Sequence, residues 1–364
     1  MPYIQALGTL GHGVTVVVEA RLTEERIRMG WSPGQCHGLT VIENPDENTV
    51  KTIVHDSDRQ SIHLLAGARG KTLGNTATRE ILLQKKRIGI ISESPDRRGP
   101  AVMLRWLKYT KERLGPGRNF DFLLTMGELG ANWFRACGYP PSKILEFAYV
   151  VEPASVTTPC NPCAPQAQPC AAEQQALRIL YAGQLIHRKG LDTFLRALAL
   201  LNGEFHVNLI GSGPKESELK HLGETLGISH KLQWRGRLPA EEVRKHMFNA
   251  DVFVLPSYHD GWGAVVNEAL MAGTPVIASQ ECGASCLLRE SYLGASYPAK
   301  DAKALTRLLQ ERIDAGPLSS AQREKIAKWS KCIHPHTMAR YFVECMEYTY
   351  EDGPKPMAPW KLNA

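Results

Sequence analysis

Hydrophobic positions along the chain alternate between two spacings. Short apolar runs such as LRILYAGQL (177–185) are followed by stretches like KGLDTFLRALALLN (189–202), whose apolar residues recur every three or four positions. The first pattern predicts a strand and the second an amphipathic helix. Their regular alternation is typical of parallel α/β layers.

The C-terminal half repeats this pattern most clearly. The final helix of the series runs from about Trp262 to Gly273, where glycine and the following Pro275 are expected to end it. Further strands are predicted at 205–213, 231–238, 251–257 and 274–279, and further helices at 214–227 and 239–250.

The N-terminal half is less regular but shows the same alternation. It predicts a helix, a Gly-rich turn and a strand over 4–20, strands at 61–67, 87–94 and 120–127, and helices at 101–115 and 128–138. Residues 152–175 are rich in Pro, Ala, Thr and Gln and have no apolar period, which indicates a linker. We therefore expect one α/β domain at 1–151, a linker at 152–175, a second α/β domain at 176–335, and a C-terminal helix and tail at 336–364 that packs back on the first domain.

Composition agrees with two globular domains. The 364 residues are 43% hydrophobic and 22% charged, which argues against a disordered chain. No apolar run approaches the roughly 20 residues needed to span a bilayer, and no secretory signal is evident. We expect a cytoplasmic protein that is soluble or peripheral on the inner face of the membrane.

Positive charge is concentrated in the first half. Between Arg69 and Arg118 there are thirteen basic and four acidic residues, which suits an anionic membrane surface, a lipid phosphate or a nucleic acid, or else forms a solvated basic face. No nucleic-acid-binding module is recognised. The helix predicted from residue 101 carries a basic stripe opposite a leucine stripe, which either docks on anionic lipid or, the interpretation we favour here, packs its leucines into the core. The stripes are Arg105, Lys108 and Lys111, and Leu104, Leu107 and Leu114.

The nine cysteines indicate reduced thiols rather than a disulfide framework, because most are scattered and their number is odd. Cys160, Cys163 and Cys170 form a CxxC with one more cysteine, but no fourth cysteine or histidine lies nearby to close a zinc site. We interpret them as an incidental feature of the linker and expect no metal.

Candidate chemistry follows the predicted strands of the second half. In doubly wound folds ligands bind outside the carboxyl ends of the strands. Arg188 and Lys189 follow the first strand, the turn 211–213 (Gly-Ser-Gly) follows the second, and 257–263 (SYHDGWG) follows the fourth and leads into a helix. Two cations, Gly-rich turns and helix N-termini at one edge fit a diphosphate.

These motifs resemble a known family. The stretches YAGQLIHRKGLDTF, LIGSGP and LPSYHDGWGAVVNEALMAGTPVIAS look like the nucleotide-sugar-binding domain of retaining family-4 glycosyltransferases (glycosyl transferases group 1) with the GT-B fold. The resemblance implies two Rossmann-like domains facing across a cleft. It also implies metal-independent transfer of a sugar, with retained anomeric configuration, from a nucleotide sugar to a glycan, lipid-linked or other glycoconjugate acceptor. No cofactor is implied.

The resemblance also implies roles for individual residues. Arg188 and Lys189 would hold the donor diphosphate, Asp260 would face the transferred sugar, and Glu268 would accept hydrogen bonds from the ribose hydroxyls. The geometry agrees, since helical side chains lean toward the N-terminus and a ribose diol can donate two hydrogen bonds; a helix-dipole role for Glu268 is the alternative. The amides of 263–265 would meet the phosphate or sugar, and the backbone of 237–238 would lie near the base. The full predicted donor site is Gly183, Arg188, Lys189, Gly211, Gly213, Arg237, Leu238, Asp260, Gly261, Trp262, Gly263, Ala264, Val265 and Glu268.

The sequence departs from the family pattern in four places. Asp260 stands where glutamate is common, and Gln184 stands where an arginine is often found. The first half begins inside the fold, so we expect the first domain to lack its first strand and its sheet to contain a gap. No histidine ends the strand at 87–94, so Glu93 or His63 are candidates to face the sugar. A catalytically weak or inactive sugar-nucleotide-binding homologue is therefore the alternative function.

Overall fold

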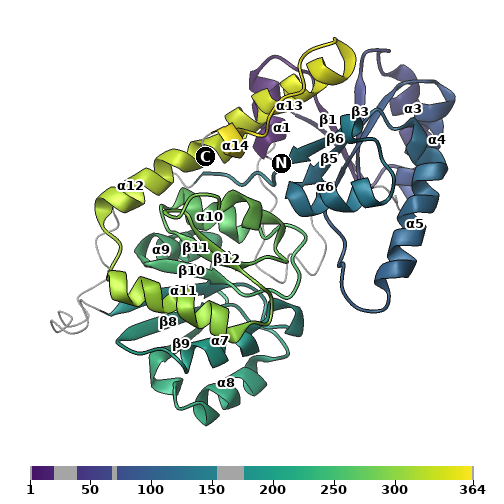
Figure 1. The fold of residues 1–364 in the computed structure, drawn as a ribbon. Helices are drawn as coiled ribbons and strands as arrows, with labels where there is room; N and C mark the ends of the chain where they lie inside the picture. Colours follow the sequence, from purple (N-terminus) through teal and green to yellow (C-terminus); the bar gives the residue numbers. More distant parts are fainter. Residues whose placement is uncertain (1, 20–38, 68–71, 154–175, 363–364) are drawn as a thin grey trace. The chain divides into compact units, whose positions relative to one another are not determined.

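The computed structural model describes residues 2–19, 39–67, 72–153 and 176–362. Two compact units divide them. The first unit combines the described residues of 1–27 and 32–150 with 333–363, and the second comprises the described residues of 151–332. Figure 1 shows the elements of each unit. Both units are built from parallel strands with connecting helices, so the predicted α/β fold class is confirmed.

The first unit has its strands in two separate parallel sheets. One contains β3, β4, β5 and β6 in that order, and the other pairs β1 with β2. The described strands of this unit thus form two sheets rather than one, and the sequence analysis expects a gap in the sheet of this domain. The elements are α1 (Pro2–Thr9), β1 (Thr15–Val18), β2 (Thr40–Glu43), α3 (Glu47–Asp56), β3 (Ile62–Ala66), α4 (Thr72–Leu83), β4 (Arg87–Ser92), α5 (Val102–Leu114), β5 (Phe122–Met126), α6 (Gly127–Ala136), β6 (Ile144–Phe147), α13 (Pro335–Tyr350) and α14 (Pro359–Leu362).

The C-terminal helix α13 is part of the first unit. It lies beside α1 in Figure 1, and Ala6 and Leu7 of α1 pack with Ala339. Hydrogen bonds tie the same helix to the ends of the strands: the Tyr341 hydroxyl donates to the Glu146 carbonyl (2.8 Å), and the Tyr350 hydroxyl donates to the Asp121 carboxylate (2.9 Å). The end of the chain therefore completes the N-terminal core.

The second unit is a six-stranded parallel sheet in the order β12-β11-β10-β7-β8-β9. The chain starts in the middle at β7, extends to β9 on one side, and then returns to β10 on the other side of β7. This reversal is the switch point at which doubly wound sheets bind ligands. The elements are β7 (Leu177–Ala182), α7 (Leu191–Leu198), β8 (Phe205–Ile210), α8 (Glu216–Thr225), β9 (Leu232–Gly236), α9 (Ala240–Asn249), β10 (Val252–Leu255), α10 (Val265–Met271), β11 (Val276–Ser279), β12 (Gly294–Tyr297), α11 (Ala302–Ala315) and α12 (Ser320–Trp329).

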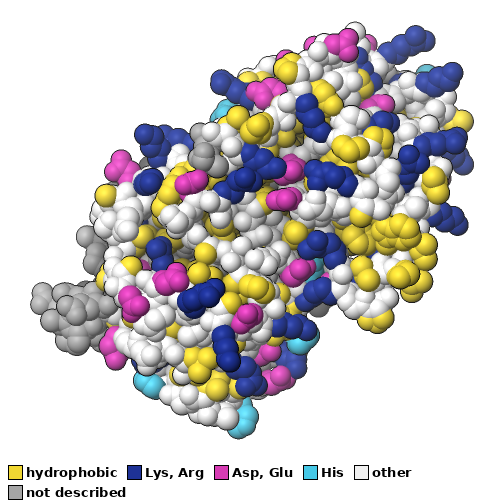
Figure 2. Space-filling model, in the orientation of Figure 1, with side chains coloured by type: hydrophobic (Ala, Val, Ile, Leu, Met, Phe, Trp, Pro, Cys, Tyr) yellow, Lys and Arg dark blue, Asp and Glu magenta, His cyan; other side chains and the backbone are white. Residues whose placement is uncertain are grey.

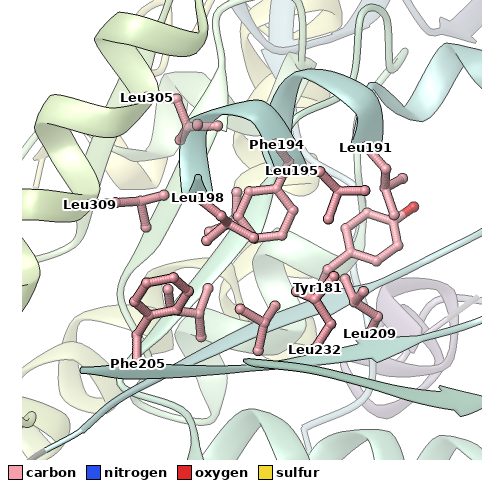
Figure 3. Packing of buried hydrophobic residues seen from close by; sticks show 14 of the residues in the cluster. Tyr181, Leu191, Phe194, Leu195, Leu198, Phe205, Leu209, Leu232, Leu305 and Leu309 are labelled. Carbon is pink, nitrogen blue, oxygen red and sulfur yellow. The ribbon is translucent and has the colours of Figure 1, made fainter. Parts of the chain in front are cut away.

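The strands of the second unit are continuous apolar runs because the sheet is covered on both faces. Every residue of β10 and β11 is buried, as expected for a parallel sheet covered on both faces. On one face, Phe194 and Leu198 of α7 pack with Leu305 of α11 over the strand residue Phe205 (Figure 3). A rigid, fully covered sheet holds the loops at its carboxyl edge in place.

Most predicted elements are present, with one shift that affects the candidate site. The helix expected from Trp262 begins at Val265, so 261–264 form a loop rather than the first helical turn. No described helix combines the length and the apolar character needed to cross a bilayer.

Candidate active site

The loop after β7 and the loop after β10 meet at the switch point of the second unit. After β7 the chain forms a short 3-10 helix, His187–Lys189, and turns through Gly190 at φ 66°. A side chain at Gly190 would collide with the backbone of Pro256, so only glycine permits this approach. The amide of Tyr258 donates to the Arg188 carbonyl (2.8 Å), which fastens the two loops together.

This contact brings two cations and one carboxylate together. Lys189 Nζ lies 2.5 Å from Asp260 Oδ2, and Arg188 Nη1 lies 3.9 Å from Asp260 Oδ1. Arg188 Nη1 also donates to the His259 carbonyl (2.9 Å). Asp260 and Lys189 are only 14% and 13% exposed, whereas Arg188 is 42% exposed. Two cations therefore share one carboxylate where these two loops meet.

The Gly-rich turn after β8 presses against the loop after β7. A Cβ on Gly211, which has φ 136°, would overlap the Gly183 carbonyl, and one on Gly213 would overlap the Leu185 carbonyl. The amide of Leu185 donates to the Ser212 carbonyl (3.0 Å). The sequence predicts that the backbone at these glycines approaches another group closely. In the structure that group is the loop after β7.

The loop after β9 joins the same edge. The Arg237 guanidinium donates to the Ser212 hydroxyl, and the Gly211 amide donates to the Gly236 carbonyl (2.7 Å). Arg237 is exposed and Leu238 is half-buried. The loops that follow β7, β8, β9 and β10 therefore adjoin one another at one edge of the sheet.

The loop before α10 offers backbone donors. Gly263 adopts φ 89°, and a Cβ built on it would lie 3.8 Å from the Asp260 carboxyl carbon. Within the described part of the chain, the amides of Gly263, Ala264 and Val265 donate no hydrogen bond. Amides without an internal acceptor are the groups that bind anions at helix starts.

Trp262 has a structural role, contrary to its place in the predicted donor site. Its side chain is 1% exposed, and its indole Nε1 donates to Asn267 Oδ1 (2.8 Å). The indole is buried beneath the loop, and the Trp262 carbonyl accepts a hydrogen bond from the Ala284 amide (2.8 Å). The tryptophan instead supports the loop that carries Asp260.

Glu268 lies in the first turn of α10 and is half-buried. Partial burial raises the pKa of its carboxyl group, and the positive charge of Arg244 opposes this shift. Lys189 is ion-paired with Asp260, whereas no ion pair links it to Glu268 among the described residues. The two carboxylates thus have different surroundings, in line with separate roles.

The two candidate residues of the first unit, Glu93 and His63, lie near opposite edges of its sheet. Glu93 is exposed directly after β4, at the carboxyl edge of the sheet. His63 is the second residue of β3 and pairs in register with Ile88, near the amino edge. Its Nε2 contacts the Ser57 hydroxyl and its Nδ1 contacts the Arg87 carbonyl, both at 3.1 Å. His63 therefore does not follow a strand, and the prediction that it faces the sugar is wrong, because ligands bind at the opposite edge.

Tyr258 also belongs to this site, although no motif in the sequence marks its role. Its hydroxyl donates to Asp192 Oδ2 (2.6 Å) and lies 2.7 Å from the Thr193 hydroxyl. Burial, together with the bond to Asp192, raises the pKa of Tyr258 to about 12. The tyrosine thereby ties α7 to the loop of Asp260. An aromatic residue two positions before Asp260 was the only signal for it.

Metal ligands are not gathered anywhere in the described ranges, where no cluster of three His, Cys, Asp or Glu side chains occurs. The expectation about Cys160, Cys163 and Cys170 concerns residues outside the described part of the chain.

Two Rossmann-like units, one with cations and open amides at its switch point, define the GT-B class of fold. Residues 167–329 match the family model of the glycosyl transferases group 1. The family resemblance noted from the strand-end motifs is thus confirmed over this stretch.

Curated relatives agree with this match. The chain is 29% identical over 234 residues to the putative colanic acid biosynthesis glycosyltransferase WcaL of Salmonella typhimurium, covering 60% of this chain and 55% of that one. It is also 29% identical over 240 residues to the amylovoran biosynthesis glycosyltransferase AmsK of Erwinia amylovora, covering 62% and 56%. The chain spans about half the length of the curated relatives it matches.

Solved structures show the same fold over nearly the whole chain. A lipopolysaccharide outer core galactosyltransferase, WaaB, superposes with a TM-score of 0.67 at 14% identity, covering 93% of this chain and 99% of that one. HepE from Anabaena in complex with UDP and glucose gives a TM-score of 0.66 at 14% identity and covers 95% of each chain.

Proposed function

We propose that this protein is a retaining glycosyltransferase that moves a sugar from a nucleotide-diphosphate sugar to a glycan, lipid-linked or other glycoconjugate acceptor. The observation that carries the proposal is the pairing of Lys189 with Asp260 at the switch point, beside the open amides of 263–265. Positive charge and backbone donors converge there on a position suited to a diphosphate.

Each group has a chemical task in this proposal. Lys189 and Arg188 neutralise the negative charge that grows on the departing diphosphate, and the amides of 263–265 donate to its oxygens or to the sugar. Stabilising the leaving group favours an oxocarbenium-like sugar, and preorganised charges usually contribute most to catalysis in such sites. Asp260 positions Lys189 and faces the sugar, while the backbone of 237–238 contacts the base.

The finer parts of the proposal have separate support. The family resemblance supports retention of configuration and transfer without a metal. The names of the relatives, which concern colanic acid and amylovoran, support a saccharide acceptor, and the HepE complex with UDP and glucose supports a uridine nucleotide sugar as the first donor to test.

A second candidate is a nucleotide-sugar-binding homologue with little or no turnover. It is favoured by Gln184, a neutral residue in the loop after β7, and by Asp260, which already compensates part of the charge of Lys189. Both features reduce the positive charge available to a leaving group.

A panel of nucleotide sugars separates the two candidates. Thermal shift identifies the donor, because a ligand that binds only the folded state raises Tm. Turnover is then measured as release of nucleoside diphosphate, and proton NMR reports the anomeric configuration of the product. Binding together with transfer supports the enzyme, and tight binding without release of diphosphate supports the homologue. If no nucleotide sugar changes Tm or is consumed, both are excluded.

Glu268→Gln tests the ribose contact. We expect the KM for the donor to rise roughly tenfold with little change in kcat, because a hydrogen bond to a charged acceptor is weakened equally in the ground state and the transition state. Glu311→Gln, an exposed substitution on α11, is the matched control. KM is measured in steady-state donor titrations. An unchanged KM in Glu268→Gln would contradict the ribose contact and favour the alternative, in which Glu268 only interacts with the helix dipole.

A further inference from the structure

Helix α5 in the first unit exposes its apolar side chains. Met103, Leu104, Leu107 and Leu114 are each more than half exposed to solvent. The interpretation that the leucine stripe of this helix packs into the core is therefore wrong. Burying such side chains is strongly favourable, so a cluster of them on one helix indicates an interaction surface.

The orientation of α5 is fixed by its other side. Tyr109 is buried, and its ring meets the edges of Trp133 and Phe134 of α6 at centroid distances of 5.6 and 5.7 Å. Trp106 Nε1 donates to the Ala136 carbonyl (2.8 Å), and Arg113 Nε donates to the Gly138 carbonyl (3.0 Å). These anchors hold the helix by Tyr109, so the leucines cannot turn inward without breaking them.

Lysines share the exposed side with the apolar residues. Lys108 and Lys111 are both exposed and lie one turn apart, next to Leu104 and Leu107. Figure 2 shows hydrophobic side chains gathered over the region that α5 occupies in Figure 1, with Lys and Arg side chains nearby. Apolar side chains flanked by lysines on one helix are the pattern of helices that lie in a membrane interface.

We propose that α5 docks this protein on an anionic lipid surface, with Met103, Leu104 and Leu107 inserted among the acyl chains and Lys108 and Lys111 at the phosphate level. The charge of the helix favours a lipid surface over a protein partner or a second copy of the chain. Lysine stems are long enough to reach headgroups while the leucines enter the apolar layer. A protein partner or a second copy of the chain would have to supply matched carboxylates, whereas an anionic leaflet presents negative charge everywhere along the helix.

Vesicle flotation with the full chain tests the proposal. The chain is expected to float with vesicles of phosphatidylglycerol and phosphatidylcholine at low salt, to float less as salt rises, and to bind pure phosphatidylcholine weakly. Lys108→Glu/Lys111→Glu is expected to lower the partition coefficient at least about 25-fold, at about fivefold for each lysine. Met103→Ser/Leu104→Ser/Leu107→Ser is expected to lower it at least about tenfold on both kinds of vesicle.

Matched controls come from exposed residues elsewhere. Lys303→Glu/Lys328→Glu makes the same change in net charge on α11 and α12, and Leu200→Ser/Met357→Ser removes exposed apolar side chains. Both controls are expected to bind like the wild type. An absence of lipid-dependent flotation overturns the proposal, as does equal loss in the controls. Self-association in sedimentation that the α5 serines abolish, with no vesicle binding, would instead assign the face to a second copy.

Discussion

Replacing Lys189 by alanine is expected to lower kcat by about 10²- to 10³-fold, the usual cost of losing one preorganised group that stabilises developing charge. Lys189 lies 2.5 Å from Asp260, is mostly buried, and stands beside the open amides of 263–265. A lysine held there contributes mainly when the diphosphate departs with its full charge. Its removal should therefore lower kcat more than it raises the KM for the donor.

Controls distinguish this loss from damage to the fold. Lys189→Arg is expected to recover part of the rate because it keeps the charge, and Lys303→Ala on the exposed side of α11 is expected to leave the rate unchanged. Removing the lysine leaves Asp260 with Arg188 at 3.9 Å, so thermal melting of each variant shows whether the loop is still in place. Near-normal turnover in folded Lys189→Ala would refute the diphosphate assignment.

Replacing Asp251 by asparagine is expected to destabilise the second unit by about 3 kcal/mol, the usual cost of breaking a buried ion pair. Asp251 is 1% exposed and accepts two hydrogen bonds at 2.8 Å from the Arg178 guanidinium. The amides of Arg178 and Leu318 donate to the same carboxylate at 3.0 Å, and Arg323 lies 3.4 Å away. Asparagine keeps the shape but removes the anion shared by half-exposed Arg178 and by Arg323, which is only 14% exposed.

The loss of stability in Asp251→Asn is expected to become smaller at low pH. Burial raises the pKa of Asp251, but the hydrogen bonds and charge of Arg178, together with the hydrogen bond from the Leu318 amide, outweigh it, so the pKa lies below its usual value. A carboxylate with a lowered pKa contributes stability above its unfolded pKa of about 3.9 and loses that contribution as the pH falls through the folded value. The Tm difference between wild type and Asp251→Asn should be about 6 to 12 °C at pH 7 and shrink below about pH 4. A difference that is constant with pH, or as small as that of the exposed Asp314→Asn, contradicts this role.

The second unit was largely predictable because its strands are buried on both faces and their ends are marked by glycines. Continuous apolar runs identified the strands, and Gly211 and Gly213 marked a turn that no other residue can form against the neighbouring loop. The approach of Lys189 to Asp260 is a different matter. The two residues are 71 positions apart in the chain, and they meet because β7 and β10 are neighbours in the sheet, which follows from strand order rather than from local pattern.

The first unit was less predictable for three physical reasons. Both sides of α5 carry apolar residues, so periodicity could not show that Tyr109 rather than Leu107 faces the core. His63 lies in a short apolar run, and the run alone does not fix at which residue the strand begins and ends. The sequence analysis expects the C-terminal helix to pack on the first domain, but the strand pattern does not show that α13 donates hydrogen bonds to Glu146 and Asp121.

The central claim, that a donor diphosphate is held by Lys189 at the switch point of the second unit, is tested most directly by calorimetric titration of UDP and UMP into wild type and Lys189→Ala. Wild type is expected to bind UDP at least about tenfold more tightly than UMP, because the second phosphate reaches the lysine. In Lys189→Ala most of this preference should disappear while UMP binding changes little. The same UDP-to-UMP ratio in both proteins would contradict the account.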